Sequence, residues 1–66
     1  MPSSKEMIAF KIGARARKMA AEECIVEGYE ILEGAIRGAG AQGDAELEAL
    51  LRAELEKYER RFLPQF

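Results

Sequence analysis

Apolar residues recur at helical spacing along two segments of this 66-residue chain, separated by a glycine-rich stretch. Residues 4–37 contain no proline and repeat apolar side chains every three or four positions, which predicts one long helix. Three glycines within residues 38–43 predict a flexible loop. Residues 45–63, preceded by the N-cap residue Asp44 and followed by Pro64, predict a shorter second helix. The expected fold class is all-α, a single helical-hairpin domain over residues 1–66.

The start of the long helix carries a specific signal. Ser3 followed by Glu6 is a capping box, in which the hydroxyl accepts from the third helical N–H and the carboxylate reaches back to the cap. The first helix is therefore expected to begin near Ser4.

Small residues recur every seven positions inside the long helix, at Ala14, Ala21, Gly28 and Ala35. A seven-residue repeat returns to nearly the same helix face, so these positions predict a shallow seam against which another helix packs closely. The second helix offers large side chains on one face. The predicted packing seam adds Ile25 and Leu32 beside the small residues and Leu47, Leu51, Leu55, Tyr58 and Phe62 opposite them.

A second apolar stripe runs along the long helix, rotated by more than a quarter turn from the first. The shorter helix cannot reach residues 4–16, so a monomer would leave this stripe in water. We therefore expect a dimer or partner interface formed by Ile8, Ile12, Met19 and Val26, together with Met7 and Phe10.

The charge distribution suggests how two copies would pair. Residues 1–21 hold five basic side chains and one acidic one, a net charge of +4, whereas residues 22–37 hold one basic and five acidic ones, a net charge of −4. This gradient opposes the helix dipole, so local helix stability does not explain it. An antiparallel pair of long helices would place each basic half over an acidic half, which predicts an antiparallel homodimeric four-helix bundle.

Size and cysteine content support the same expectation. A chain this short has little core, and a single cysteine with no histidine excludes an internal disulfide and disfavours a structural zinc site. Oligomerisation is the remaining way to add stability. Met1 leads into a helix signature without an apolar signal segment, so the expected location is the cytoplasm.

No residue pattern predicts chemistry. Gly38-x-Gly40-x-x-Gly43 matches the dinucleotide fingerprint in letters, but a helix rather than a strand precedes it. Glu23, Glu27 and Glu30 share a face that is expected to be solvated, and Cys24 has no histidine to activate it. We therefore expect no catalytic, cofactor-binding or metal-ligating residues, no cofactor, and no enzyme activity.

Basic residues on the first helix are the feature that suggests a nucleic-acid ligand. Lys11, Arg15 and Lys18 lie at i, i+4 and i+7, with Arg17 on the same segment, and such a stripe can bridge phosphates. The other interpretation is that these bases pair with the acidic half of a second chain. The predicted layout resembles that of the Rop-type plasmid copy-number regulators, antiparallel hairpin dimers that bind paired RNA loops. That resemblance implies a nucleic-acid-binding regulator and transfers no individual residue.

The last residues offer a further surface. Phe62, Leu63 and Phe66 surround Pro64 and either fold over the open end of the bundle or act as a docking tail. Taken together, the pattern favours a non-enzymatic regulatory or adaptor protein that dimerises and binds, and modulates or inhibits, a protein partner, such as a phage or mobile-element inhibitor of a host protein. The alternative is a Rop-like regulator that binds RNA or DNA. Insertion into a membrane surface is disfavoured by the acidic segment.

Overall fold

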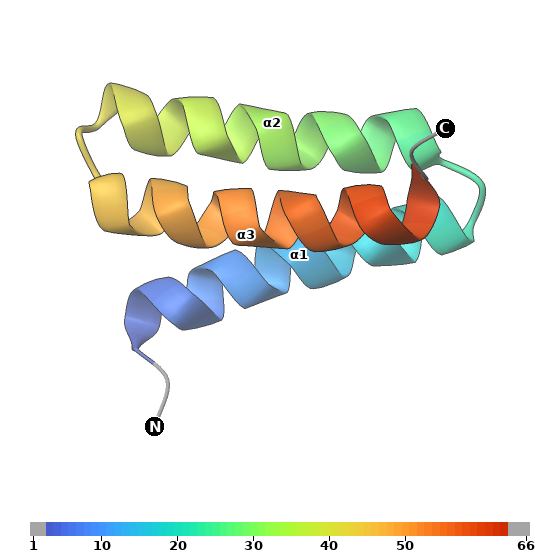
Figure 1. The fold of residues 1–66 in the computed structure, drawn as a ribbon, viewed down its shortest axis with the longest axis horizontal. Coiled ribbons are helices and arrows are strands. Elements are labelled where there is room, and N and C mark those ends of the chain that lie inside the picture. The colour runs from blue at the N-terminus through green and yellow to red at the C-terminus, as the bar shows by residue number, and fades with distance from the viewer. Residues whose placement is uncertain (1–2, 64–66) are drawn as a thin grey trace.

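Three helices of similar length form the fold in the computed structural model, which describes residues 3–63. Helix α1 spans Ser4–Ala21, α2 spans Ile25–Ala41 and α3 spans Ala45–Phe62. Figure 1 shows α2 and α3 antiparallel to one another, with α1 crossing behind α3 and running in the same direction as α3. The N-terminal half of α1 diverges from the α2–α3 pair. Each helix nevertheless packs against both of the others.

The start of α1 follows the capping signal in the sequence. Ser3 Oγ accepts from the backbone N–H of Glu6 at 3.1 Å, and Glu6 Oε1 accepts from the N–H of Ser3 at 3.4 Å. Both halves of the capping box are present, and the helix begins at Ser4 as predicted.

The expected single helix over residues 4–37 is wrong, because the chain turns back at residues 22–24. Glu23 adopts a left-handed backbone with φ of 70°. Its N–H donates to the carbonyl of Ala20 at 3.0 Å, and the N–H of Cys24 donates to the carbonyl of Met19 at 2.8 Å. These two bonds are those of a Schellman motif, which ends a helix and reverses the chain.

The expected loop over residues 38–43 is also too long. Helix α2 continues through Gly38 and Gly40 to Ala41, and only residues 42–44 form the turn. Gly43 has a φ of 71°, and its N–H donates to the carbonyl of Gly40 at 3.1 Å. The N–H of Asp44 donates to the carbonyl of Ala39 at 2.9 Å, which gives the second turn the same Schellman geometry as the first.

Helix α3 agrees closely with the second predicted helix. Asp44 is its N-cap, accepting from the N–H of Leu47 at 3.1 Å. The Asp44 carboxylate also accepts from Lys5 Nζ at 3.0 Å, which joins the start of α3 to the start of α1. This hydrogen bond raises the pKa of Lys5 and, from the other side, lowers the pKa of Asp44.

The core forms two adjoining clusters, and the buried residues that α1 contributes to them are all alanines. One cluster contains Ala9, Ile36, Ala39 and Leu51, and the other contains Ala16, Ala20, Leu32 and Tyr58. Ile12 and Leu55 pack against both. Small side chains on α1 let its backbone lie close to the leucines and Tyr58 of the other two helices.

Because the chain reverses at residues 22–24, residues 4–16 do not project beyond a shorter helix as the predicted hairpin required. Residues 4–16 lie within α1, which packs against α2 and α3 of the same chain. The all-α fold class is therefore correct, whereas the long-armed hairpin is replaced by a three-helix bundle. Among residues 3–63, no helix is long and apolar enough to cross a membrane.

Candidate protein-binding groove

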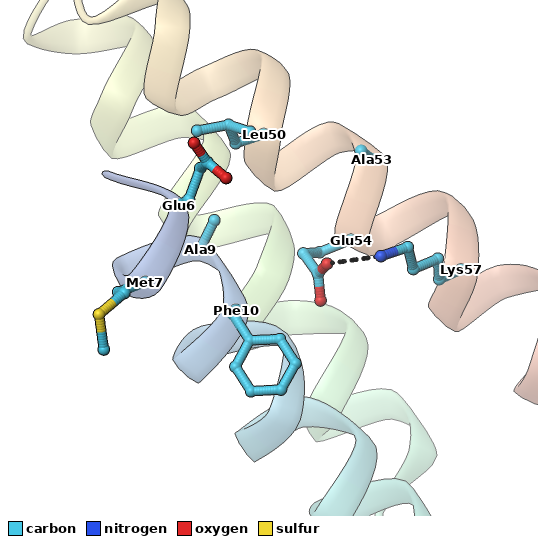
Figure 2. A pocket seen from close by; sticks show the side chains of 8 residues that line it. All are labelled: Glu6, Met7, Ala9, Phe10, Leu50, Ala53, Glu54 and Lys57. Carbon is cyan, nitrogen blue, oxygen red and sulfur yellow. Dashed lines mark hydrogen bonds and ion pairs between the residues drawn. The ribbon is translucent and has the colours of Figure 1, made fainter. Parts of the chain in front are cut away.

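A groove lies between the diverging half of α1 and the middle of α3, with a volume of about 490 Å³. Figure 2 shows the side chains that line it, four from each helix. They are Glu6, Met7, Ala9 and Phe10 from α1 and Leu50, Ala53, Glu54 and Lys57 from α3. The groove exists because α1 and α3 separate toward the N-terminal end of α1, where alanines cannot fill the space between them.

Two large apolar side chains of α1 remain in solvent beside the groove. Phe10 is 60% exposed and Met7 is 46% exposed. In Figure 2 the Phe10 ring lies along the groove, whereas Met7 points away from α3. The Arg17 guanidinium lies 5.7 Å from the centre of the Phe10 ring, which holds a cation over one face of the aromatic side chain. An exposed aromatic beside an apolar groove is typical of protein interfaces.

Glu54 closes one end of the groove with a buried carboxylate. Its residue is 7% exposed, and it accepts from Arg17 Nη1 at 2.9 Å and from Lys57 Nζ at 3.1 Å. Burial raises the pKa of Glu54, but the hydrogen bonds from Arg17 and Lys57 outweigh burial and hold that pKa below its ordinary value. The carboxylate is therefore ionised at neutral pH and pins α1 to α3.

Gly13 makes room for this carboxylate on the α1 side. A Cβ at position 13 would lie 2.9 Å from Glu54 Cδ and closer still to Oε1. The absence of a side chain at Gly13 is thus what allows a charged group to be buried between the two helices.

The predicted dimer or partner residues divide into exposed and packed positions. Ile8 is 46% exposed on α1 and Val26 is 67% exposed on α2, whereas Ile12 packs against the core and Met19 is half-buried. Together with Met7 and Phe10 they do not form one surface, because the turn at residues 22–24 moves Val26 onto a different helix.

The predicted packing seam is likewise divided between helices. Ala14 and Ala21 belong to α1, where Ala21 is exposed, and Gly28 and Ala35 belong to α2, where Gly28 is buried. The remaining seam residues are buried or half-buried, and they are Ile25, Leu32, Leu47, Leu51, Leu55, Tyr58 and Phe62.

Gly28 leaves room for the buried side chain of Tyr58. A Cβ at position 28 would lie 2.6 Å from the Tyr58 hydroxyl and 2.7 Å from the carbonyl oxygen of Ala16. That hydroxyl donates a hydrogen bond to the carbonyl of Ile25, which satisfies the buried phenol. Burial raises the Tyr58 pKa, so the side chain stays neutral and keeps donating.

The basic stripe is placed on the outer surface of α1. Lys11, Arg15 and Lys18 are exposed, and within residues 3–63 none of them forms an ion pair. Arg17 differs from them because it is half-buried and bonded to Glu54. The structure therefore separates Arg17, a structural residue, from three bases that face solvent.

The C-terminal candidates are only partly described. Phe62 packs against Tyr58, with ring centres 5.1 Å apart, and Leu63 is 38% exposed. Phe66 lies outside the described residues.

Chemically reactive side chains do not gather at one site in the described part of the chain. Cys24 is a half-buried free thiol at the start of α2, with its sulfur 3.8 Å from the carbonyl of Glu22. Over residues 3–63, no group of three or more acidic, cysteine or histidine side chains is arranged to hold a metal ion.

The α3 side of the groove was missed from the sequence. The sequence pattern places Leu50 at the edge of the apolar face of α3 and does not single out Ala53, Glu54 or Lys57. One signal was present: Glu54 lies three residues after Leu51 and four before Tyr58, so a charge falls on the buried face of a helix.

No family model, curated protein or solved structure matches this chain.

Proposed function

We propose that this protein is a non-enzymatic binding protein of the cytoplasm whose α1–α3 groove receives an amphipathic helix of a protein partner. The observation that carries the proposal is the exposure of Phe10 and Met7 beside an apolar groove. Small proteins rarely leave a contiguous apolar surface of this kind in water without a partner for it.

The shape of the groove favours a helix as the ligand. Two helices form its walls, and the small side chains Ala9 and Ala53 keep it open for a backbone or a large side chain. Helices bind such grooves through apolar side chains at i, i+3, i+4 and i+7, with their polar face outward. By covering that helix, the protein modulates or inhibits the partner.

Site-specific photo-cross-linking tests this proposal in cells that express the protein. A photoreactive amino acid at position 10 is expected to form adducts with a partner, whereas the same residue at position 26, which is similarly exposed but lies on α2, is not. A helical peptide from the captured partner should then bind the purified protein and lose affinity for the Phe10→Asp variant. Absence of adducts from position 10, or equal adducts from both positions, contradicts the proposal.

A second candidate function, nucleic-acid binding, is favoured by one observation. Lys11, Arg15 and Lys18 form an exposed stripe on α1 without acidic partners among the described residues. Phosphate binding by such a stripe weakens steeply with salt, whereas an apolar groove binds its ligand with little salt dependence. A binding titration over a salt series therefore separates the two functions.

A further inference from the structure

The ends of the groove differ in charge. Glu6 lines the end where α1 and α3 begin, and Lys57 lines the opposite end. Lys5 and Asp44 form an ion pair near the first end and cancel one another, and Glu46, whose charge also raises the pKa of Lys5, adds to Glu6, so this end is net acidic. At the second end Arg17 and Lys57 share the single carboxylate of Glu54, which leaves a net charge of +1.

The charges at the two ends of the groove are complementary to those of a second copy that lies antiparallel over it. Because α1 and α3 run in the same direction, a second copy related by a two-fold axis across the groove would run antiparallel to the first. The acidic end of each copy would then lie over the basic end of the other. A parallel copy would oppose like charges, so the charges select the two-fold arrangement.

We propose that the occupant of the groove is a second copy of this chain. In this two-fold dimer Phe10 of each copy enters the groove of the other beside its Ala53 and Leu50. Glu6 of each copy lies over the basic end of the other, where Arg17 and Lys57 share Glu54. The inference rests on the proposed function, because it assigns a partner to the same groove.

The size of the molecule is compatible with this interface. A stable interface buries roughly 800 Å² on each partner, which is about one sixth of the 4734 Å² that this chain exposes. The apolar centre is provided by Phe10 with Leu50 and Ala53, and the charges form the rim, which is the usual arrangement in protein interfaces.

Molar mass by light scattering and sedimentation equilibrium over a dilution series tests the proposal. A reducing buffer is required because the free thiol of Cys24 can cross-link chains. The expected species at high concentration has twice the 7.4 kDa mass of the chain. A mass of one chain at every concentration, up to the solubility limit, overturns the inference.

Two aspartate variants locate the interface. Phe10→Asp should raise the dimer Kd by roughly tenfold or more, because a charge enters the apolar centre. Val26→Asp is the matched control, since Val26 is also exposed but lies on α2, and it should leave the Kd unchanged. Equal effects of the two variants place the interface elsewhere. Circular dichroism checks that both remain helical.

Exchange of the two rim charges tests the antiparallel arrangement. Glu6→Lys alone and Lys57→Glu alone each oppose like charges twice in their own dimers and should dimerise more weakly. The double variant with Glu6→Lys and Lys57→Glu restores both opposite-charge pairs in an antiparallel homodimer but not in a parallel one, so it should dimerise more tightly than either single variant. A double variant no tighter than the single variants contradicts the two-fold arrangement.

These outcomes are separate from those of the proposed function. A monomer that still forms adducts with another protein from position 10 removes the second copy as occupant and leaves the groove as a binding site. A monomer that forms no such adducts removes both. A dimer that Phe10→Asp dissociates supports both, because the groove then holds a helix of a second chain.

Discussion

Two glycines set the distance between the helices at the residue scale. At Gly28 the missing side chain leaves room for the Tyr58 hydroxyl, and at Gly13 it leaves room for the Glu54 carboxylate. In both cases a polar group reaches a hydrogen-bond partner that it would otherwise lose. Neither glycine has a positive φ, so close approach rather than backbone freedom explains them.

Replacement of Gly28 by alanine is expected to destabilise the bundle by about 1–3 kcal/mol, because neither the rigid phenol nor the Ala16 backbone can move away easily. Gly34→Ala is the matched control on the same helix, where nothing lies within 4 Å of the added Cβ. That change should stabilise the protein by roughly 0.5–1 kcal/mol through helix propensity. Thermal unfolding of the two variants measures both effects, and melting temperatures shifted in the same direction would count against close packing at Gly28.

Glu54 gives the stability an acid dependence. Its pKa in the folded state lies below the ordinary value of 4.5, so the unfolded state binds more protons as the pH falls through this range. The stabilisation is therefore fully present above pH 4.5 and is lost as the pH falls through the folded-state pKa. Asp44, whose pKa is also lowered, contributes in the same direction.

Glu54→Gln should lower stability at neutral pH and reduce the loss of stability on acidification. Urea unfolding at a series of pH values measures this dependence. Glu56→Gln serves as the control, because the Glu56 side chain is 61% exposed and its pair with Arg60 is a surface ion pair. If both variants retain the acid dependence of the native chain, the Glu54 ion pairs do not hold α1 to α3.

At the scale of elements, the two turns share one geometry but only one has the usual sequence. Gly43 occupies the left-handed position of the second turn, whereas Glu23 occupies the same position of the first. A side chain in this conformation costs about 1–2 kcal/mol relative to a right-handed one. Packing of Ala16 and Ala20 against Leu32 and Tyr58 offsets this cost, because it forms only when the chain reverses.

This difference explains which elements the sequence predicted. The start of α1 and nearly all of α3 were predictable, because Ser3 and Asp44 are caps with visible partners in the chain. The turn at Glu22-Glu23-Cys24 contains no glycine, proline or asparagine, so local pattern gave no reason to end the helix there. The glycines at 38 and 40 gave the opposite error, since they adopt helical conformation inside α2.

Glycine at position 23 should remove the strain of the first turn. Glu23→Gly is expected to stabilise the protein by up to about 1 kcal/mol, and Gly43→Ala to destabilise it by a similar amount. The φ angles of 70° and 71° make these two positions a matched pair. Denaturant midpoints measure the changes, and a destabilised Glu23→Gly variant would show that the glutamate side chain itself supports the turn.

At the scale of the whole molecule, the fold changes the meaning of the charge gradient. The basic segment forms α1, and most of the acidic segment forms α2, so the two lie side by side within one chain. The exposed bases Lys11, Arg15 and Lys18 nevertheless form no ion pair with α2.

Sequence alone identified the exposed Met7 and Phe10 but placed the partner surface on a projecting arm, because the opposite wall of the groove depends on how α3 packs beside α1.

Reversal of Arg15 and Lys18 to glutamate separates the three roles that these bases could have. Neither residue lines the groove, so a dimer through the α1–α3 groove should keep its Kd in this variant. The hairpin dimer expected from the sequence alone would weaken, since its basic half would lose two charges, and nucleic-acid binding would fall steeply, with the salt slope smaller by about two phosphate contacts. Arg52→Glu with Arg60→Glu on α3 is the control of equal net charge. Sedimentation equilibrium and RNA titration on both variants decide among the roles. An unchanged dimer with no difference in RNA binding assigns the bases to solvation. A selective loss of RNA binding makes α1 a nucleic-acid-binding helix.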